Sequence, residues 1–555
     1  MASDIPETQT ALQLTGPDEL TINYSKPVIQ PGPYQILCKI EAVGLCFSDL
    51  KLLKQFGDHA RKTNIISGID PVILEEIPSY VAGVKPAVPG HEAVGRVCAV
   101  GDQVQGIELN HRYLVQTDYR WLPTEHSNAS FGYNFEGGLQ EYVLLDQRVI
   151  TSPEGESMLI PAPEGLSASA IALVEPWACV EHAYAIKERQ HINTDGKMLV
   201  VADEDIDLKG FIAFLIAFGQ PAEITALPNT PLVLPSLLVK TIENLEQASD
   251  TGYQDVIYYG ANPTRAEAIF NKVAAKGLYN IVQCGKTFGR DVITQIGRVH
   301  YGGIRLIGTT GSDPAKSMQR IPTQPELRPG DNINVVGAAG PMGTMNVIRN
   351  ICQAVKGTTI YAASRDIKRL TKLNQLAQPF AQKNQVGYVP YSLSENTLDV
   401  EFDYVALMAP VPHLVESAVK EIREKGIVNI FAGIPGHVST PIDLDRYIEK
   451  ELYFIGTSGS TLDDMYAVLK KVETGQLDTN MSVAAVCGLE NAIDGIRAVE
   501  HHKIAGKILV YPGRAELPLT PLEDISEVVP ELAEHMTENT WTKAAEDTLL
   551  QLQMG

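Results

Sequence analysis

Four side chains in the first third of the sequence are of types that bind metal ions. Cys46, His91, Glu92 and Glu175 lie in the segments VGLCFSDLKLL (43–53), VPGHEAVGRVCAVGDQV (88–104) and ALVEPWACVEHA (172–183). Thiolate, imidazole and carboxylate ligands together fit a catalytic zinc with an exchangeable water better than a closed structural site. A lone buried Cys is usually a small hydrophobic residue, and a lone GHE is usually a turn. The prediction therefore depends on all three segments occurring in order.

A second kind of chemistry is indicated by NINVVGAAGPMGTMNVI (332–348), where an apolar run meets a glycine-rich turn. The pattern predicts a strand, a turn and a helix whose N-terminal N–H groups bind a pyrophosphate. The first position of the usual glycine fingerprint is Ala338, with Gly337 one residue earlier. The candidate nucleotide-binding residues in this turn are Gly337, Gly340, Pro341, Met342 and Gly343. Ala409, Gly433 and Ile434 follow later strands of the same unit, where the other half of a dinucleotide is expected.

The sequence also repeats itself over this region. RVHYGGIRLIGTTGS begins at Arg298 and RYIEKELYFIGTSGS begins at Arg446, 148 residues later, and Asp255 and Asp403 have the same spacing. We interpret this as two copies of one α/β domain. The first copy begins KMLVVADEDIDLKG (197–210), in which Asp203, Glu204, Asp205 and Asp207 replace the glycine turn. Because carboxylates repel a pyrophosphate, we expect the first copy to bind no nucleotide; the alternative is a cationic ligand.

Together these motifs resemble the zinc-dependent medium-chain dehydrogenase/reductase family, in the branch of sorbitol, threonine and glucose dehydrogenases. FAGIPG (431–436), YFIGTSGSTLDDM (453–465) and LPLTPL (517–522) are similar to L-sorbose-1-phosphate reductase-type members. The resemblance implies an α/β protein with a GroES-like β-rich catalytic domain (1–190) and two tandem Rossmann domains. These are a degenerate one (191–318) and a nucleotide-binding one (319–480). Residues 481–555 then return to the catalytic domain and end in a helical tail.

The resemblance also assigns roles to residues. Cys46, His91 and Glu92 hold the zinc, and Glu175 binds it directly or through water. Ser48 stands where the family often places a proton-relay hydroxyl; the alternative is that Ser48 caps a helix beginning at Asp49. Family members often carry a four-cysteine structural zinc lobe, but residues 111–138 contain no Cys, so we expect one catalytic zinc and no structural zinc.

The end of the strand YAASRD (361–366) bears on the choice of cofactor. NAD enzymes usually place an acidic residue there to bind the ribose hydroxyls, whereas NADP enzymes offer Arg or small polar groups. Ser364 occupies the expected acidic position, and Arg365 and Arg369 follow, so we favour NADP(H) over NAD(H). The rival interpretation takes Asp366 as the ribose ligand and predicts NAD.

The substrate implied is the secondary alcohol or ketone of a polyol, a sugar or a sugar phosphate. Alternatives are an amino-alcohol or a cyclitol, or a non-catalytic scaffold derived from the fold. His59, Arg61 and Lys62 form a basic cluster that either binds a phosphate ester or lies in a solvated loop. His182 is expected to be a packed helix residue.

Composition limits the partners. The formal net charge of −22 argues against non-specific binding to nucleic acid or an anionic membrane. No apolar run reaches 18 residues, and GFIAFLIAFG (210–219) is interpreted as a buried helix. The start of the sequence lacks a signal-peptide pattern, and seven scattered cysteines favour reduced thiols, hence a cytoplasmic location. Since dimers of the family pair their nucleotide domains edge to edge, the first copy is expected to act as a built-in partner. The chain is then a monomer or a homo-oligomer.

Overall fold

The computed structural model describes residues 5–227, 232–234, 237–394, 398–537 and 540–552. The chain forms two compact units, which we call the first and second units. The first comprises Met1–Ala178 and Gly459–Gly555, and the second comprises Cys179–Ser458. Among the described residues, no helix combines the length and the apolar character needed to cross a membrane.

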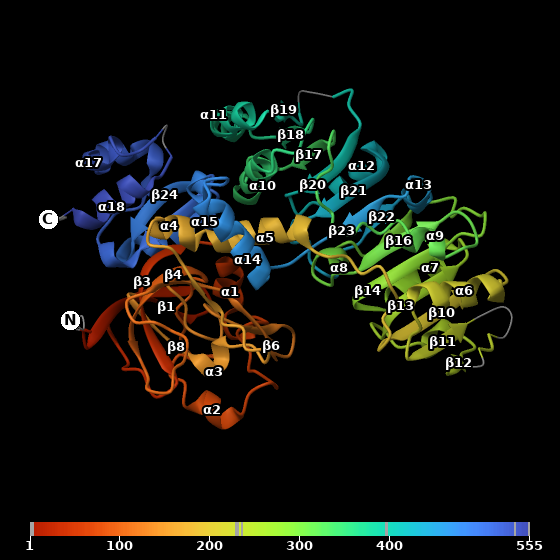
Figure 1. Ribbon diagram of the computed structural model, residues 1–555, viewed down its shortest axis with the longest axis horizontal. Helices are drawn as coiled ribbons and strands as arrows, with labels where there is room; N and C mark the ends of the chain where they lie inside the picture. The colour runs from red at the N-terminus through yellow and green to blue at the C-terminus, as the bar shows by residue number, and fades with distance from the viewer. Residues whose placement is uncertain (1–4, 228–231, 235–236, 395–397, 538–539, 553–555) are drawn as a thin grey trace. The chain divides into compact units, whose positions relative to one another are not determined.

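The first unit is rich in β-structure (Figure 1). Its largest sheet has the strand order β26-β24-β25-β3-β4-β5-β9, and β8 also pairs with β3. These strands are β3 (Gln35–Gly44), β4 (Glu92–Val100), β5 (Arg112–Val115), β8 (Tyr142–Asp146), β9 (Leu159–Pro161), β24 (Val483–Gly488), β25 (Lys507–Tyr511) and β26 (Thr520–Pro521). Two antiparallel pairs complete it, β1 (Thr8–Gly16) with β2 (Glu19–Pro27) and β6 (Asp118–Pro123) with β7 (Asn128–Ser130).

The register of this sheet brings distant segments together. β3 is almost continuously buried, as expected of a central strand, and it pairs antiparallel with β4 so that Gly44 lies opposite Glu92. β25 pairs with the same end of β3, because Leu509 lies opposite Gly44. The end of β3, the start of β4 and the start of β25 therefore meet at one place.

Helices of the first unit connect and cover these strands. They are α1 (Phe47–Gln55), α2 (Pro71–Glu75), α3 (Gln147–Ile150), α4 (Ala168–Ala172), α14 (Leu462–Glu473), α15 (Ala492–Glu500), α16 (Ile525–Val528), α17 (Pro530–Ala533) and α18 (Lys543–Gln551). α5 (Val174–Ala185) begins in this unit and ends in the second. The predicted helical tail is packed, since the side chains of Trp541 and Glu546 are buried. The Glu546 carboxylate accepts hydrogen bonds from the backbone N–H groups of Ala168 and Ser169 and from the Tyr511 hydroxyl.

The second unit contains two six-stranded parallel sheets with the same topology (Figure 1). The first sheet has the order β12-β11-β10-β13-β14-β16, and the second has the order β19-β18-β17-β20-β21-β23. The first comprises β10 (Lys197–Ala202), β11 (Glu223–Leu227), β12 (Val239–Thr241), β13 (Tyr253–Tyr259), β14 (Val273–Val282) and β16 (Arg305–Thr309). The second comprises β17 (Asn332–Val336), β18 (Thr359–Ser364), β19 (Gly387–Ser392), β20 (Phe402–Leu407), β21 (Ile422–Ile430) and β23 (Tyr453–Ile455). Both have the order of a Rossmann-like sheet.

Helices cross between these strands, as parallel connections require. In the first half they are α6 (Leu208–Phe218), α7 (Pro263–Phe270), α8 (Gly297–His300) and α9 (Ala315–Met318). In the second they are α10 (Pro341–Cys352), α11 (Ile367–Asn384), α12 (His413–Glu421) and α13 (Leu444–Glu449).

The two sheets of the second unit meet at their β16 and β23 ends. β15 (Val292–Thr294) pairs antiparallel with β22 (Thr440–Ile442), so that Val292 lies opposite Ile442 and Thr294 opposite Thr440. With the 148-residue spacing, Val292 corresponds to Thr440 and Thr294 to Ile442. Val292 thus pairs with the counterpart of Thr294, and Thr294 pairs with the counterpart of Val292. This reciprocal pairing is the pattern of an isologous, two-fold contact. The Tyr447 hydroxyl strengthens this contact by donating to the Leu306 carbonyl at 2.7 Å.

One predicted element differs from the structure. The apolar run 210–219, which is too short to span a bilayer and forms most of α6, is interpreted from the sequence as a buried helix. Phe211, Phe214 and Leu215 do pack against the sheet, but Ile212 and Ile216 are exposed. The expectation was wrong because only one face of a helix can contact the sheet that it crosses.

Candidate metal centre and nucleotide site

Three of the four predicted metal ligands are brought together in the first unit. One ligand atom each from Cys46, His91 and Glu92 lie within 4.8 Å of one another. Cys46 is the N-cap of α1, directly after β3, and His91 and Glu92 stand at the start of β4. The antiparallel pairing of β3 with β4 therefore builds the cluster from two segments that are 45 residues apart in sequence.

The imidazole of His91 is oriented by a residue that the sequence analysis missed. His91 Nδ1 lies 2.9 Å from the Asp49 carboxylate on the first turn of α1. A carboxylate on Nδ1 fixes the tautomer that leaves Nε2 to bind a metal. Burial lowers the pKa of His91, but Tyr133 and Asp49 outweigh it and leave the pKa well above its usual value. The signal was available: Asp49 follows Cys46 by three residues, at the position of a capping-box acid.

Glu92 has a buried cation as its neighbour. The Lys507 ammonium, at the start of β25, donates to Glu92 Oε1, and both side chains are almost completely buried. Gly44 leaves room for the other oxygen, because a Cβ on Gly44 would lie 2.1 Å from Glu92 Oε2. Neither residue was predicted, since their relation to Glu92 depends on the order of the strands.

The donor set of this cluster fits a metal ion. Glu92 Oε2 is buried and has no hydrogen-bond partner among the described residues, which is costly unless a ligand satisfies it. A thiol, an imidazole nitrogen and this carboxylate oxygen converge in a buried site, and they are ligand types that zinc accepts.

Glu175 lies outside the compact cluster but close to it. Its side chain is buried on the first turn of α5. Burial raises the pKa of Glu175 to about 7, and the charge of Glu92 raises it further while that of His91 lowers it. A carboxyl group that is half protonated near neutral pH can bind a cation or a water at this position.

Ser48 lies beside the same cluster. Its hydroxyl donates to Cys46 Sγ at 3.0 Å and lies 3.3 Å from His91 Nε2. The alternative that Ser48 caps a helix beginning at Asp49 was wrong, because α1 begins at Phe47 with Cys46 as its N-cap. The relay role stays a prediction.

The predicted basic cluster does not form one surface. Lys62 is fully buried, and its ammonium donates to the carbonyls of Val81, Gly83 and Lys85. Arg61 forms an ion pair with Asp118 at 3.0 Å. Both alternatives were therefore wrong for Lys62. Its ammonium contacts neither solvent nor a phosphate, and its hydrogen bonds hold the loop 81–85 in place. His182 on α5 is half-buried, in agreement with a packed helix residue.

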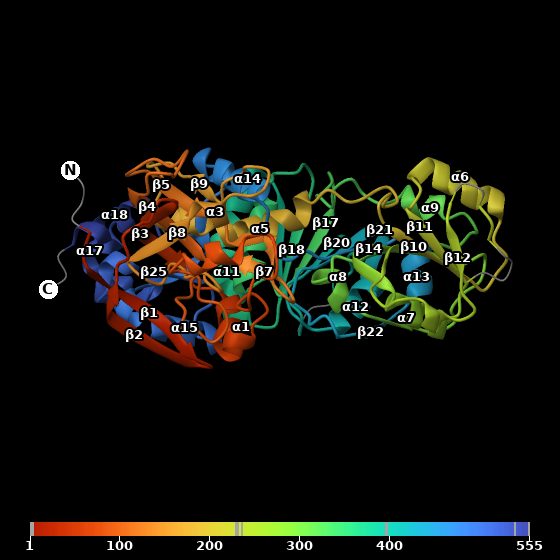
Figure 2. The ribbon, with the colours of Figure 1, turned by 90° about the horizontal axis from the view of Figure 1, so that it is seen from below.

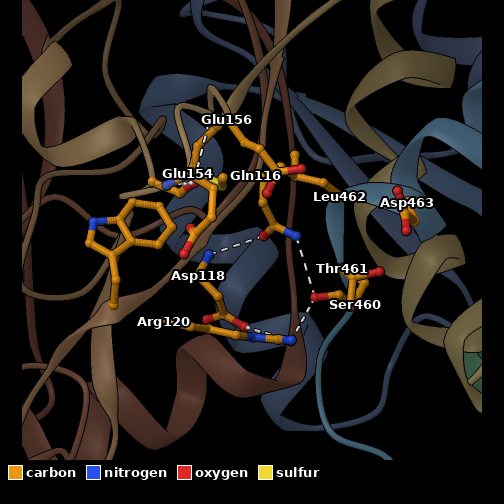
Figure 3. A pocket seen from close by; sticks show the side chains of 12 residues that line it. Gln116, Asp118, Arg120, Glu154, Glu156, Ser460, Thr461, Leu462 and Asp463 are labelled. Atoms are coloured by element: carbon orange, nitrogen blue, oxygen red, sulfur yellow. Dashed lines mark hydrogen bonds and ion pairs between the residues drawn. The ribbon is translucent and has the colours of Figure 1, made fainter. Parts of the chain in front are cut away.

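A pocket of about 240 Å³ opens in the first unit (Figure 3). Its polar wall includes Gln116, Asp118, Arg120, Glu154, Glu156 and Asp463. Arg120 and Gln116 both donate to the Ser460 carbonyl, at 2.6 and 3.4 Å, as the dashed lines in Figure 3 show. Four carboxylates against one guanidinium give the pocket an acidic lining, which favours hydroxyl or ammonium groups over phosphate.

The predicted glycine-rich turn joins β17 to α10 in the second unit. Gly337 has φ +87°, and Gly340 is the N-cap, followed by Pro341 and Met342 in the first turn. A Cβ on Gly343 would lie 2.2 Å from the Gly337 carbonyl oxygen, so only glycine fits there. Gly340 has no side chain to cap the helix, and the N–H groups of α10 therefore remain suited to an anion.

The residues after β18 divide into two kinds. Ser364 ends the strand, and its hydroxyl accepts from the Asp366 N–H at 3.1 Å, while Arg365 is exposed. Asp366 is the N-cap of α11: its carboxylate accepts from the Arg369 N–H at 3.0 Å and pairs with the Arg369 guanidinium. Asp366 is thus engaged in capping its own helix.

The residues predicted near the nicotinamide follow β20 and β21. Ala409 lies next to the turn, because its backbone nitrogen would be 3.3 Å from a Cβ on Gly337. Gly433 is exposed, whereas the side chain of Ile434 is buried in the core shared by both sheets. Ile434 is therefore left with only its backbone to offer to a ligand.

The corresponding turn of the first sheet is occupied by its own carboxylates. The N-cap of α6 is Asp207, which accepts from the Lys209 N–H at 3.0 Å. Asp203 receives hydrogen bonds from Tyr258 and Arg265, and Glu204 pairs with Lys286. Acidic side chains therefore fill the place that a phosphate would take.

Comparison with known proteins bears on the family. Residues 32–154 match the alcohol dehydrogenase GroES-like domain. The chain is 29% identical over 244 residues to the uncharacterized protein YggP of Escherichia coli and 26% identical over 234 residues to L-sorbose 1-phosphate reductase of Klebsiella pneumoniae. These matches agree with the resemblance to the medium-chain dehydrogenase/reductase family that the motifs carry.

The extent of these matches is limited. Each covers 40% of this chain, and they cover 57% and 56% of the two relatives, so the chain spans little more than half their length. Among solved structures, 2R,3R-butanediol dehydrogenase from Bacillus subtilis is 16% identical with a TM-score of 0.51, over 91% of this chain and all of that one. At this identity the likeness shows the fold alone: a GroES-like domain with Rossmann-like sheets.

Proposed function

We propose that this chain is a zinc-dependent oxidoreductase that transfers a hydride between a nicotinamide nucleotide and a secondary alcohol or ketone. The cluster of Cys46, His91 and Glu92, with its unsatisfied buried carboxylate oxygen, carries the proposal. The glycine turn before α10 supports it, because the turn leaves a helix N-terminus suited to a pyrophosphate. The relatives named as dehydrogenases and reductases agree with this chemistry.

Zinc, when bound, would act as a Lewis acid that lowers the pKa of the alcohol. Cys46, His91 and Glu92 would hold it, with Glu175 as a direct or water-mediated fourth ligand. Asp49 keeps His91 in the required tautomer, and Lys507 pairs with the buried Glu92 carboxylate and orients it. The Ser48 hydroxyl, which already contacts Cys46 and His91, is placed to accept and pass on the alcohol proton.

The acidic pocket supports a hydroxyl-rich substrate. Carboxylates accept hydrogen bonds from polyol or sugar hydroxyls and repel a phosphate ester, and the buried Lys62 offers no compensating charge. A neutral polyol or sugar is therefore the substrate class proposed. An amino-alcohol is the second candidate, since the same carboxylates attract an ammonium group.

The proposed cofactor is NADP(H), one per chain, together with one zinc. Asp366 caps α11 and pairs with Arg369, which leaves the exposed Arg365 to meet a ribose phosphate. We ascribe the two sheets to a duplication. The shared strand order and the symmetric β15–β22 pairing support this origin, and the Asp207 cap supports a nucleotide-free first copy.

In this division residues 1–190 form the catalytic domain, 191–318 the degenerate Rossmann domain and 319–480 the nucleotide-binding one, with 481–555 returning to the catalytic domain. The first copy then covers a sheet edge that would otherwise pair with a second subunit.

The direct test combines metal analysis with activity. Purified chain is expected to hold one zinc and to reduce NADP⁺ with a panel of polyols faster than with polyol phosphates. Cys46→Ala should lose zinc and activity but keep NADPH binding, while Cys98→Ala, which alters a half-buried thiol on β4, should keep all three. A chain that binds neither zinc nor nucleotide would be a scaffold, and the proposal would be wrong.

A further inference from the structure

The exposed face of α6 carries several large apolar side chains. Leu208, Ile212 and Ile216 are 37%, 41% and 73% exposed and follow one another at four-residue intervals. Ala213 and Ala217 lie beside them and are also exposed. Figures 1 and 2 show α6 on the outside of the first sheet. A contiguous apolar stripe of this kind usually marks a contact surface.

The equivalent helix of the second sheet shows which contacts such a face makes. Leu199 of β10 pairs with Val256, and Ile333 of β17 pairs with Tyr404. Since Val256 and Tyr404 are 148 residues apart, Leu199 and Ile333 are equivalent. The helices that follow begin at the N-caps Asp207 and Gly340, so α6 and α10 can be compared position by position.

In this comparison the exposed residues of α6 fall on buried residues of α10. Ile212, Ala213, Ile216 and Ala217 correspond to Met345, Asn346, Arg349 and Asn350, which are at most 2% exposed.

The last turns of α5 cover that face of α10. The Tyr184 hydroxyl donates to Asn346 at 2.9 Å and accepts from Asn350 at 2.9 Å, and Glu181 forms a bidentate pair with Arg349. The chain has one α5 for two equivalent helix faces. It therefore covers one of them and leaves the other exposed.

The residue types on α6 identify its partner. Every polar anchor of α10 is replaced by Ile or Ala, so the partner surface must also be apolar. The large Ile residues next to small Ala residues form the ridges and grooves with which helices pack. α6 is the one described helix with three large apolar side chains along an exposed stripe, so the α6 of a second copy offers the apolar surface that this one requires.

The charges near α6 argue against a lipid surface. Glu204, Asp205 and Asp207 precede the helix and Lys209 is its one cation, whereas membrane-surface helices carry several Lys or Arg residues. An antiparallel pair of α6 helices keeps the two acidic N-termini about 16 Å apart, the length of an 11-residue helix.

We propose that two copies of this chain associate through an antiparallel, two-fold α6–α6 contact. The inference rests on the equivalence of the two sheets proposed above, but it is independent of catalysis. A contact confined to this stripe is smaller than a standard interface, so the association is concentration-dependent rather than permanent. The dimer uses a new surface because the β15–β22 contact is already formed within one chain.

The test is sedimentation velocity of the full chain over about a hundredfold range of concentration. Wild type is expected to shift from monomer to dimer. Ile212→Glu/Ile216→Glu should raise the dissociation constant at least about tenfold, because it places four carboxylates in the contact. Val72→Glu is the control, because Val72 is an apolar residue on α2 whose 62% exposure lies between those of Ile212 and Ile216, and it should behave as wild type. Unchanged circular dichroism would show that each variant folds.

A second variant tests the geometry of the contact. Ala213 lies near the proposed two-fold axis, and Ala213→Cys is expected to give an oxidised dimer that wild type, with its seven free thiols, does not form. Wild type that stays monomeric at the highest concentration would overturn the proposal, as would a dimer insensitive to the double substitution. Monomeric chain that sediments with neutral lipid vesicles through Ile212 and Ile216 would assign the face to a membrane instead.

Discussion

Replacing Lys507 by Met tests how the buried carboxylate at the metal centre is held. The Lys507 ammonium donates to Glu92 Oε1, and the two side chains are 4% and 0% exposed. Met has a similar length but no charge, so the substitution leaves an uncompensated carboxylate in the core. Breaking a buried pair in this way costs about 3–5 kcal/mol.

Two measurements follow from this magnitude. The three tryptophans, Trp121, Trp177 and Trp541, all lie in the first unit, so their fluorescence during urea unfolding reports on that unit alone. The metal-free variant should lose about 3–4 kcal/mol at pH 7. Because Lys507 no longer orients the Glu92 carboxylate, zinc affinity measured against a competing chelator should fall about 10–100-fold.

The pH dependence gives a sign that distinguishes this mechanism from simple loss of packing. In wild type, Glu92 and its neighbours raise the pKa of Lys507, despite the opposing effect of burial. The contribution of Lys507 ionisation to the stability of wild type is therefore lost as pH rises from the ordinary lysine pKa of about 10.4 through the raised folded-state pKa, and the Met variant lacks this loss.

A matched control separates burial from charge. Lys54→Met removes a Lys that pairs with Asp18 on the surface of the same unit, where the side chains are 49% and 44% exposed. Solvent screens an exposed pair of this kind, so this variant should unfold almost as wild type does. If Lys507→Met lost less than about 1 kcal/mol and kept its zinc affinity, the role assigned to the ion pair would be refuted.

Gly343→Ala should abolish NADPH binding in a fluorescence titration, because the added Cβ would lie 2.2 Å from a backbone oxygen. Gly210→Ala is the control at the equivalent position of α6. Its added Cβ would lie 3.6 Å from the nearest atom, so this variant should bind NADPH normally. Burial raises the pKa of Glu175 to about 7, so the metal-free folded state keeps a proton that the unfolded state releases, and stability should fall by up to about 4 kcal/mol as pH rises from 4 to 7. Glu175→Gln should flatten that profile, and an unchanged slope would contradict the assignment. Glu546→Ala leaves the Ala168 and Ser169 N–H groups and the Tyr511 hydroxyl without their acceptor. Its free energy of unfolding in urea, followed by tryptophan fluorescence, should therefore fall by about 1–3 kcal/mol.

Some features of this protein were readable from the sequence because they depend on local order. The glycine turn from Gly337 to Gly343 follows from short-range backbone geometry, and the 148-residue repeat appears directly in two similar segments. Cys46, His91 and Glu92 were recognised because each stands at a strand end within a short motif. The structure then places their ligand atoms within 4.8 Å.

Other features were decided only when distant segments packed together. Lys507 is 415 residues from Glu92 and reaches it because β25 pairs with β3, an order of strands that no local pattern encodes. Lys62 looked like a surface cation until three backbone carbonyls enclosed its ammonium. The apolar helix α6 looked buried, but burial depends on what covers the second face. The sequence carries the types and local geometry of its residues. The tertiary fold determines which charged groups are buried away from water and which apolar faces stay exposed to it.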